Sequence, residues 1–425
     1  MPNGYGMLEG AIVLVYLVVA LVLRSKKPWI PVWSIMAFAS FMTILFGLLD
    51  FDHITQVVDL DVVLFLVGMF SLVGLANASG LLEYISIRFT SLFHRRVTLI
   101  YGSALLFGVL AAFAVNDTVA LMGPPIAYTI ATASGIDPRF MFLLLAFSLT
   151  IGSVMTPIGN PQNLLIAIQS GVKAPFIIFL VKLTVPTILN ILLTALVLQG
   201  IFRIRDQRLD RSSLPRAVLR NRRDALLAGV GLVLAVVLLV VNDLLELYDL
   251  PHAEHRGIIP FILAAGTYLF TTSPRRVLSE VDWGTIVFFI TMFITMDGVW
   301  RSGVLQPLLS KLLPSRELGL LGVVRITVTS ILMSQLLSNV PFVKLFIEYM
   351  RNIGYSDGDV DSWLTLAMSS TIAGNLTLLG AASNIIILEV LESRMNSTIT
   401  FTEFLKIGSI VTLLNTLIYL IFLLH

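Results

Sequence analysis

The stretch AFSLTIGSVMTPIGNPQNLLI at residues 146–166 returns 221 residues later as AMSSTIAGNLTLLGAASNIII at residues 367–387. Eight of the 21 aligned positions are identical, and each copy places Gly, Thr, Ser and Asn inside an apolar run. A helix that only spans a membrane has no need of such residues, because Gly and Pro interrupt the helical hydrogen-bond ladder. The pair therefore predicts two broken helices at corresponding positions of a duplicated fold.

The composition around these stretches is that of a polytopic membrane protein. The chain has 425 residues, of which 57% are hydrophobic and 13% charged, and its mean hydropathy is +0.92. Repeated apolar stretches have the length that crosses a hydrocarbon core of about 30 Å. Residues 1–10 lack the basic start of a signal peptide, so we expect the first apolar segment to remain as a span.

Several classes of function are excluded at this stage. The absence of cysteine rules out disulfides and thiolate metal sites, and a net charge of +2 gives no indication of nucleic-acid binding. The five histidines show no metal-ligand spacing, and the sequence has no Walker motif or nucleophile elbow. We therefore predict no enzyme, no catalytic residue and no resident metal or cofactor.

The hydropathy pattern predicts an all-α fold with about ten transmembrane helices. The expected spans are 9–24, 29–49, 60–78, 140–170 (broken), 176–201, 225–243, 257–273, 283–300, 362–393 (broken) and 403–424. Two further apolar segments, 97–134 and 319–352, are too long for one span and carry polar residues at their centres. We interpret both as re-entrant hairpins, since irregular backbone at membrane depth must be buried in protein or face water.

The duplication extends to the hairpins. At an offset of 223 residues, Asn116 aligns with Asn339 and Asp59 aligns with Asp282. An odd number of spans in each half inserts the second copy upside down, which predicts two inverted-topology repeats at 1–201 and 225–425. Paired broken helices in such repeats are a sequence indicator of a secondary transporter's binding site.

The segment 202–224 between the repeats carries eight arginines. The positive-inside rule places this segment in the cytoplasm, so both chain termini are expected outside. We expect the protein in a prokaryotic inner membrane, with the lipid bilayer as its surroundings.

The hairpin tips and broken segments supply the candidate site. Asn116-Asp117-Thr118 and Ser338-Asn339 stand where two helices meet, and 156–163 and 374–384 free backbone carbonyls for a cation or helix N-termini for an anion. The predicted substrate- and ion-binding residues are Asn116, Asp117, Thr118, Thr156, Gly159, Asn160, Asn163, Ser338, Asn339, Asn375, Thr377, Gly380, Ser383 and Asn384.

Two charged residues are candidates for coupling. Asp117 is an ionisable group at membrane depth, which favours a proton or cation site, although it can also act as a helix N-cap. Lys344 is a counter-charge for Asp117 or for an anion in one interpretation. In the other it extends to the membrane surface or pairs with Glu348 on the same helix face.

With these motifs placed, nearly the whole chain resembles the ion transporter superfamily. The residues NDT at 116–118 and SNV at 338–340 match the positions of the Ser-Asn-Thr hairpin tips in the divalent anion/sodium symporters. The residues GNLTLLGAASN at 374–384 are similar to the GNxTLxGxxxN signature of the arsenite permease and sodium/proton antiporter (ArsB/NhaD) type. Asp117 replaces an amide of the carboxylate symporters, which favours the ArsB/NhaD branch.

The resemblance implies an elevator-type transporter that forms a homodimer and couples to H⁺ or Na⁺. It favours proton-coupled efflux of a small inorganic species such as arsenite or antimonite, with an ATPase subunit as a further partner of an arsenite-type permease. Na⁺/H⁺ antiport and Na⁺- or H⁺-coupled transport of an anion or carboxylate are the alternatives. A channel would use the same hairpins without accumulating its substrate.

Overall fold

The computed structural model describes residues 4–27, 29–209, 217–378, 380–395 and 398–424. Throughout these residues the chain is helical, with short 3-10 turns and one isolated bridge between Arg95 and Arg208. Nine helices in the described part are long and apolar enough to cross a membrane. The protein is therefore an all-α polytopic membrane protein, as the sequence predicts.

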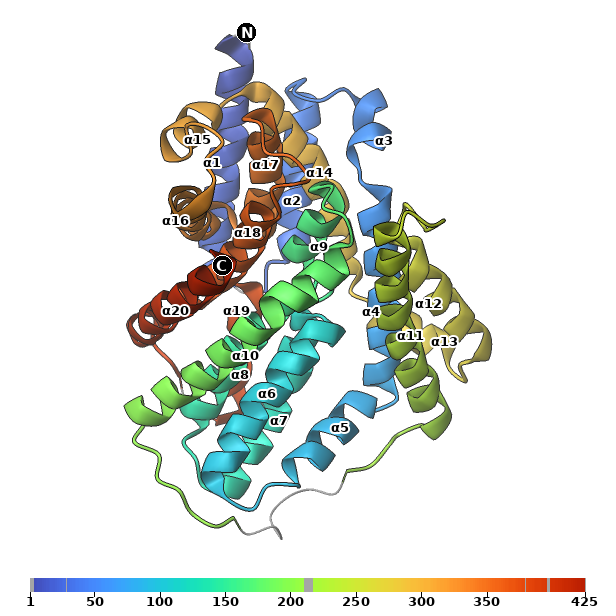
Figure 1. Cartoon of the computed structure of the whole chain (residues 1–425), viewed down its shortest axis with the longest axis vertical. Coiled ribbons are helices and arrows are strands. Elements are labelled where there is room, and N and C mark those ends of the chain that lie inside the picture. The colour runs from blue at the N-terminus through green and yellow to red at the C-terminus, as the bar shows by residue number, and fades with distance from the viewer. Residues whose placement is uncertain (1–3, 28, 210–216, 379, 396–397, 425) are drawn as a thin grey trace.

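The same series of helices occurs in both halves (Figure 1). In the first half the series is α4 (Leu60–Ala78), α5 (Leu81–Thr90), α6 (Arg96–Ala114), α7 (Asn116–Ser134), α8 (Pro138–Gly152), α9 (Pro161–Gln169) and α10 (Pro175–Ile201). In the second half it is α14 (Trp283–Ser302), α15 (Gln306–Leu312), α16 (Gly319–Leu337), α17 (Asn339–Asn352), α18 (Val360–Ile372), α19 (Ala382–Met395) and α20 (Phe401–Leu423).

The helices that precede each series are exchanged between the halves. The first pair, α1 (Gly4–Lys26) and α2 (Val32–Leu45), packs against α14 of the second half. The second pair, α11 (Arg222–Leu247) and α12 (Ile258–Phe270), packs against α4 of the first half. Side chains of the first helix can therefore reach a site that the second half helps to build.

Some predicted boundaries are wrong. The span expected at 29–49 is helical for only 14 residues in α2, and the one at 257–273 for only 13 in α12. At 1.5 Å per residue, each covers about 20 Å, less than the hydrocarbon core. Gly47 ends the first of them with a φ of +70°. Four short helices were not predicted, because they lie in the connections between spans: α3 (Ile54–Val57), α5, α13 (Pro274–Glu280) and α15.

The two predicted hairpins are helix pairs that lie at opposite ends of the molecule. Figure 1 shows α6 and α7 in its lower half, near the chain that links the two halves, and α16 and α17 in its upper half. Each pair turns on one residue between its helices, Val115 in the first and Ser338 in the second. The arginines of the 202–224 linker include Arg211 and Arg216, which lie outside the described residues.

Polar side chains hold the last helices of the two halves together. The hydroxyls of Thr187 on α10 and Tyr419 on α20 are 2.6 Å apart, and the Asn415 amide donates to the Thr194 hydroxyl at 3.3 Å. Buried hydrogen bonds of this kind fix the register of membrane helices, since no water is present to compete for them.

Candidate functional site

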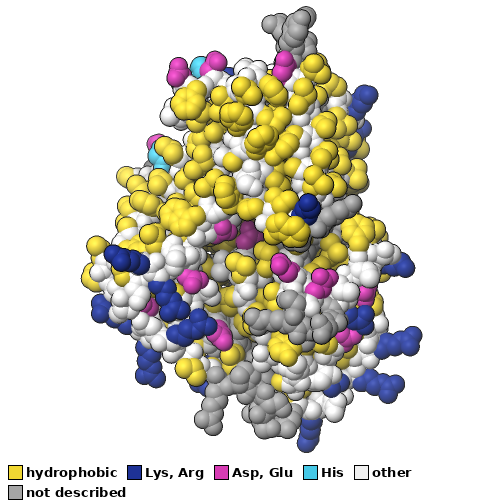
Figure 2. Space-filling view, turned by 180° about the vertical axis from the view of Figure 1, so that it is seen from behind, with side chains coloured by type: hydrophobic (Ala, Val, Ile, Leu, Met, Phe, Trp, Pro, Cys, Tyr) yellow, Lys and Arg dark blue, Asp and Glu magenta, His cyan; other side chains and the backbone are white. Residues whose placement is uncertain are grey.

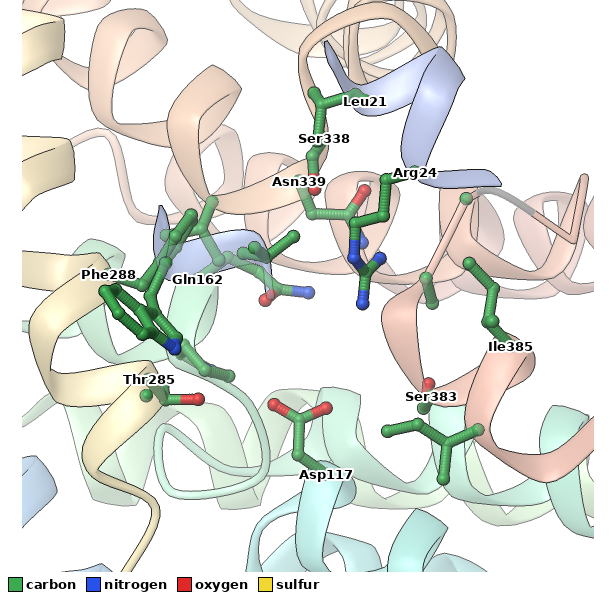
Figure 3. A pocket seen from close by; sticks show the side chains of 18 of the residues that line it. Leu21, Arg24, Asp117, Gln162, Thr285, Phe288, Ser338, Asn339, Ser383 and Ile385 are labelled. Carbon is green, nitrogen blue, oxygen red and sulfur yellow. The ribbon is translucent and has the colours of Figure 1, made fainter. Parts of the chain in front are cut away.

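A cavity of about 360 Å³ lies where the two hairpin tips face each other (Figure 3). Its walls come from the end of α1, the tips of α7 and α17, and the starts of α9, α14 and α19. We call it the central cavity. Its polar lining residues are Arg24, Asn116, Asp117, Gln162, Asp282, Thr285, Gln335, Ser338, Asn339 and Ser383.

The two tips present equivalent groups to the central cavity. Asn116 and Asn339 are the first residues of α7 and α17, so the positive ends of both helices lie here, although the Asn116 N–H itself donates to the Gly159 carbonyl at 2.9 Å. The side-chain Oδ1 atoms of both asparagines are buried and have no hydrogen-bond partner in the described part of the chain. Two acceptors and two positive helix ends therefore meet in one place.

Both tips are held in a backbone conformation that side chains rarely adopt. Val115 has φ 61° and ψ 128°, and Ser338, its equivalent at the offset of 223, has φ 69° and ψ 157°. Such conformations cost about 1–3 kcal/mol each and occur mainly at ligand clamps and switch regions. The strain is duplicated along with the tips.

Two charges break the symmetry of the cavity. Asp117 corresponds to Val340 in the second tip, and Arg24 at the end of α1 corresponds to Leu247 at the end of α11. Figure 3 shows the Arg24 guanidinium and the Asp117 carboxylate pointing toward each other across the cavity. The charges of Arg24 and Asp282 both act on Asp117.

Asp282 serves mainly as a helix cap. One of its oxygens accepts from the Thr285 N–H at 3.0 Å and the other from the Thr285 hydroxyl at 2.6 Å. Its repeat equivalent Asp59 caps α4 in the same way, by accepting from the N–H groups at the start of that helix. The capping role explains why both repeats carry an aspartate here, whereas Asp117 and Arg24 have no such duplicate.

The broken helices are braced by one asparagine each. The Asn163 amide donates to the carbonyls of Ser153, Val154 and Thr156 at 3.0–3.2 Å. Its equivalent Asn384 donates to the carbonyl of Gly374 at 2.7 Å. These side chains hold the unwound backbone in place.

A second brace joins each unwound segment to its hairpin. The Thr156 hydroxyl donates to the Ala112 carbonyl on α6. The Thr377 hydroxyl donates to the Gln335 side chain on α16 at 2.7 Å, and Ala112 and Gln335 are equivalent at the offset of 223. Each hairpin and its broken helix are thereby tied into one unit.

The structure thus divides the predicted site residues into two groups. Those that line the central cavity are Asn116, Asp117, Ser338, Asn339, Gly380 and Ser383. Those that lie away from its walls are Thr118, Thr156, Gly159, Asn160, Asn163, Asn375, Thr377, Asn384 and Lys344.

Lys344 pairs with Glu348 on the same helix face, which is one of the interactions expected from the sequence. Its ammonium lies 2.7 Å from the Glu348 carboxylate and 5.9 Å from the centre of the Phe293 ring. Five polar residues line the cavity but were not predicted from the sequence: Arg24, Gln162, Asp282, Thr285 and Gln335. Arg24 has no equivalent in the other repeat, where Leu247 takes its place.

Fold and cavity define the class of the protein: an all-α polytopic membrane protein in which two helix series of the same order enclose a central cavity. The profile of the family described as "CitMHS: Citrate transporter" matches residues 15–373, and the chain belongs to this family. The narrower assignment to the ArsB/NhaD type is not confirmed.

Proteins of several organisms are similar to the chain in sequence. The chain is 28% identical over 384 residues to a 46 kDa membrane protein of Mycobacterium leprae, with 86% of each chain covered. It is 26% identical over 396 residues to an uncharacterized transporter of Mycobacterium tuberculosis, covering 88% of this chain and 87% of that one. It is 22% identical to the human P protein, covering 84% of this chain and 52% of that protein.

A solved structure shares the fold. The crystal structure of the Alcanivorax borkumensis YdaH transporter matches with a TM-score of 0.55 at 14% identity, covering 88% of this chain and 86% of that one. This likeness shows a shared helical fold.

Proposed function

We propose that the protein is a secondary active transporter that moves a small organic anion of the carboxylate class together with a proton. The observation that carries this proposal is the Arg24 guanidinium, which faces Asp117 and the start of two helices across one cavity (Figure 3). Guanidinium groups bind carboxylates with two parallel hydrogen bonds, and helix N-termini add a positive potential. The family description, which names citrate, supports the same class of substrate.

Asp117 supplies a reason for coupling. An ionised carboxylate beside an anionic substrate raises the free energy of the loaded site, and a proton on Asp117 removes that repulsion. Substrate and proton then favour each other's binding, which by linkage couples their movements. Alternating exposure of this site, by movement of the hairpins and broken helices against α1 and α14, is the elevator-type mechanism that we propose.

The sequence-based hypothesis of arsenite or antimonite efflux stays a prediction, as does Na⁺/H⁺ antiport. Arsenite is a neutral hydroxide near neutral pH, so it would bring no anionic group of its own to Arg24. Dimer formation and an inner-membrane location are parts of the same proposal. Figure 2 shows Lys and Arg side chains gathered around the lower part of the molecule, which supports a cytoplasmic position for that end.

Ligand-dependent thermal stabilisation of the purified protein tests the proposal. A ligand that binds the folded state at 100 times its Kd adds about 2.7 kcal/mol of stability, which raises the melting temperature measurably. We expect citrate or succinate to raise it more than arsenite, antimonite, Na⁺ or Li⁺ does, and more at low pH than at high pH. Stabilisation by arsenite alone would contradict the proposal.

A further inference from the structure

A line of hydroxyl side chains runs along α16 toward the central cavity. Thr327, Ser330 and Ser334 are buried, and none of their hydroxyls has a hydrogen-bond partner in the described part of the chain. They are spaced by three and four residues, and a further step of four reaches Ser338, which lines the cavity. The three residues Thr327, Ser330 and Ser334 form what we call the hydroxyl seam.

The seam lies on the packed face of α16. Residues three and four apart share one side of a helix, and α16 packs against α18, α17 and the 3-10 turn η4 (Ala373–Asn375), whose Ala373 carbonyl accepts from the Gln335 amide of α16 at 2.8 Å. Asn375 in that turn is fully buried, and neither its Oδ1 nor its Nδ2 has a partner in the described residues. Four buried polar side chains from two elements thus follow one interface.

The seam and the tip residue together have a length comparable to half of a hydrocarbon core. Thr327 and Ser338 are eleven residues apart, which is about 16 Å along a helix and half of a hydrocarbon core of about 30 Å. Figure 1 places α16 in the upper half of the molecule, at the end opposite the linker between the repeats. The seam therefore lies in that upper half, and Ser334 at its end is four residues from Ser338 in the lining of the central cavity.

The first repeat provides an internal comparison. The equivalents of Thr327, Ser330 and Ser334 at the offset of 223 are Ala104, Phe107 and Ala111, all fully buried on α6. The equivalent of Asn375 at the offset of 221 is Val154. Close helix packing is thus achieved with apolar residues in the first repeat, so packing alone does not require the hydroxyls of the second.

We propose that the hydroxyl seam is a hydrated path by which the coupling cation passes between the upper surface and the central cavity. Hydroxyl and amide groups can donate and accept, which allows them to hold a file of water molecules or a hydrated proton at membrane depth. The first hairpin, with alanines and a phenylalanine in these places, offers no such path. Passage of a coupling cation along the seam rests on the proposed coupled transport. Hydration of the seam does not depend on that proposal.

Cysteine labelling tests the hydration directly, since the natural chain contains no cysteine. Ser330→Cys and Ser334→Cys would be exposed to a small methanethiosulfonate ethylammonium reagent in proteoliposomes, with Ala104→Cys and Ala111→Cys as matched controls in the first repeat. Thiols react as thiolates and need water, so we expect labelling at least about tenfold faster in the seam than in the controls. Equal rates at all four positions would overturn the proposal.

A second measurement tests passage of the cation. The double variant Ser330→Ala/Ser334→Ala should keep the affinity for citrate or succinate and lose about tenfold in gradient-driven uptake, because it removes groups that carry water rather than groups that touch substrate. Ser409→Ala, at an exposed hydroxyl on α20, is the control. An unchanged uptake rate would overturn the role in coupling. The labelling needs no substrate, so it tests hydration of the seam even if the proposed transport function is wrong. The two hypotheses can therefore fail separately.

Discussion

Replacement of Arg24 by glutamine should weaken binding of a carboxylate substrate by more than tenfold. Two opposite charges about 4 Å apart attract each other by about 4 kcal/mol at the effective dielectric constant of a protein site. Loss of one partner of a buried, hydrogen-bonded charge pair costs about 2–5 kcal/mol. Taking about 3 kcal/mol, and tenfold for every 1.4 kcal/mol, the Kd rises by about 150-fold.

Equilibrium binding of radiolabelled citrate and succinate to the purified protein is the assay. Arg24→Lys keeps the charge and loses the paired hydrogen bonds. Its Kd should therefore lie between that of the natural protein and that of Arg24→Gln. Arg275→Gln, at an exposed arginine on α13, is the matched control and should bind normally. A Kd for Arg24→Gln within about threefold of the natural value would refute the role of Arg24, since that change corresponds to less than 1 kcal/mol.

Three further predictions concern coupling, packing and pH. Asp117→Asn should retain anion binding but make it independent of pH in the same assay, since it removes the titrating group; unchanged pH dependence would exclude Asp117. Gly152→Ala would place a methyl group 2.2 Å from the Gly108 carbonyl oxygen, so we expect a loss of about 3 kcal/mol, seen as poor folding in size-exclusion chromatography. Hydrogen bonds from Arg316 at 2.6 and 3.0 Å lower the pKa of Asp359, so their stabilisation is present above about pH 4 and lost as pH falls below it. Melting curves of the natural protein should show this loss as the pH falls from about 4 to about 3, and those of Arg316→Gln should show a smaller loss.

The main features of the fold could be predicted from the sequence because its two halves can be aligned with each other, at offsets of 221 and 223 residues. Asn116 and Asn339 were expected at two facing tips, and the structure brings both to one cavity. Pro157 and Pro161 lack N–H donors, which predicts the break that α8 and α9 show. The short helices were missed because hydropathy reports apolar length and not where a helix ends.

Arg24 lies beside Lys26 and Lys27 at the end of an apolar run. That pattern is typical of the positive-inside rule, and nothing in the repeat marks Arg24 as different. Only the exchange of α1 onto the second half brings it to Asp117. Asn163 was predicted to bind a ligand, but its amide is occupied by three carbonyls of its own unwound segment. Tertiary contacts of this kind leave no local pattern in a single sequence.

Concentrative uptake into proteoliposomes tests the central claim most directly. An inward proton gradient would be imposed on vesicles containing the purified protein, and radiolabelled citrate and succinate would be followed over time with and without a protonophore. We expect the anion to accumulate inside above its external concentration and to leak out when the protonophore is added. Uptake that stops at equal concentrations on both sides, with or without the gradient, would contradict proton-coupled anion transport.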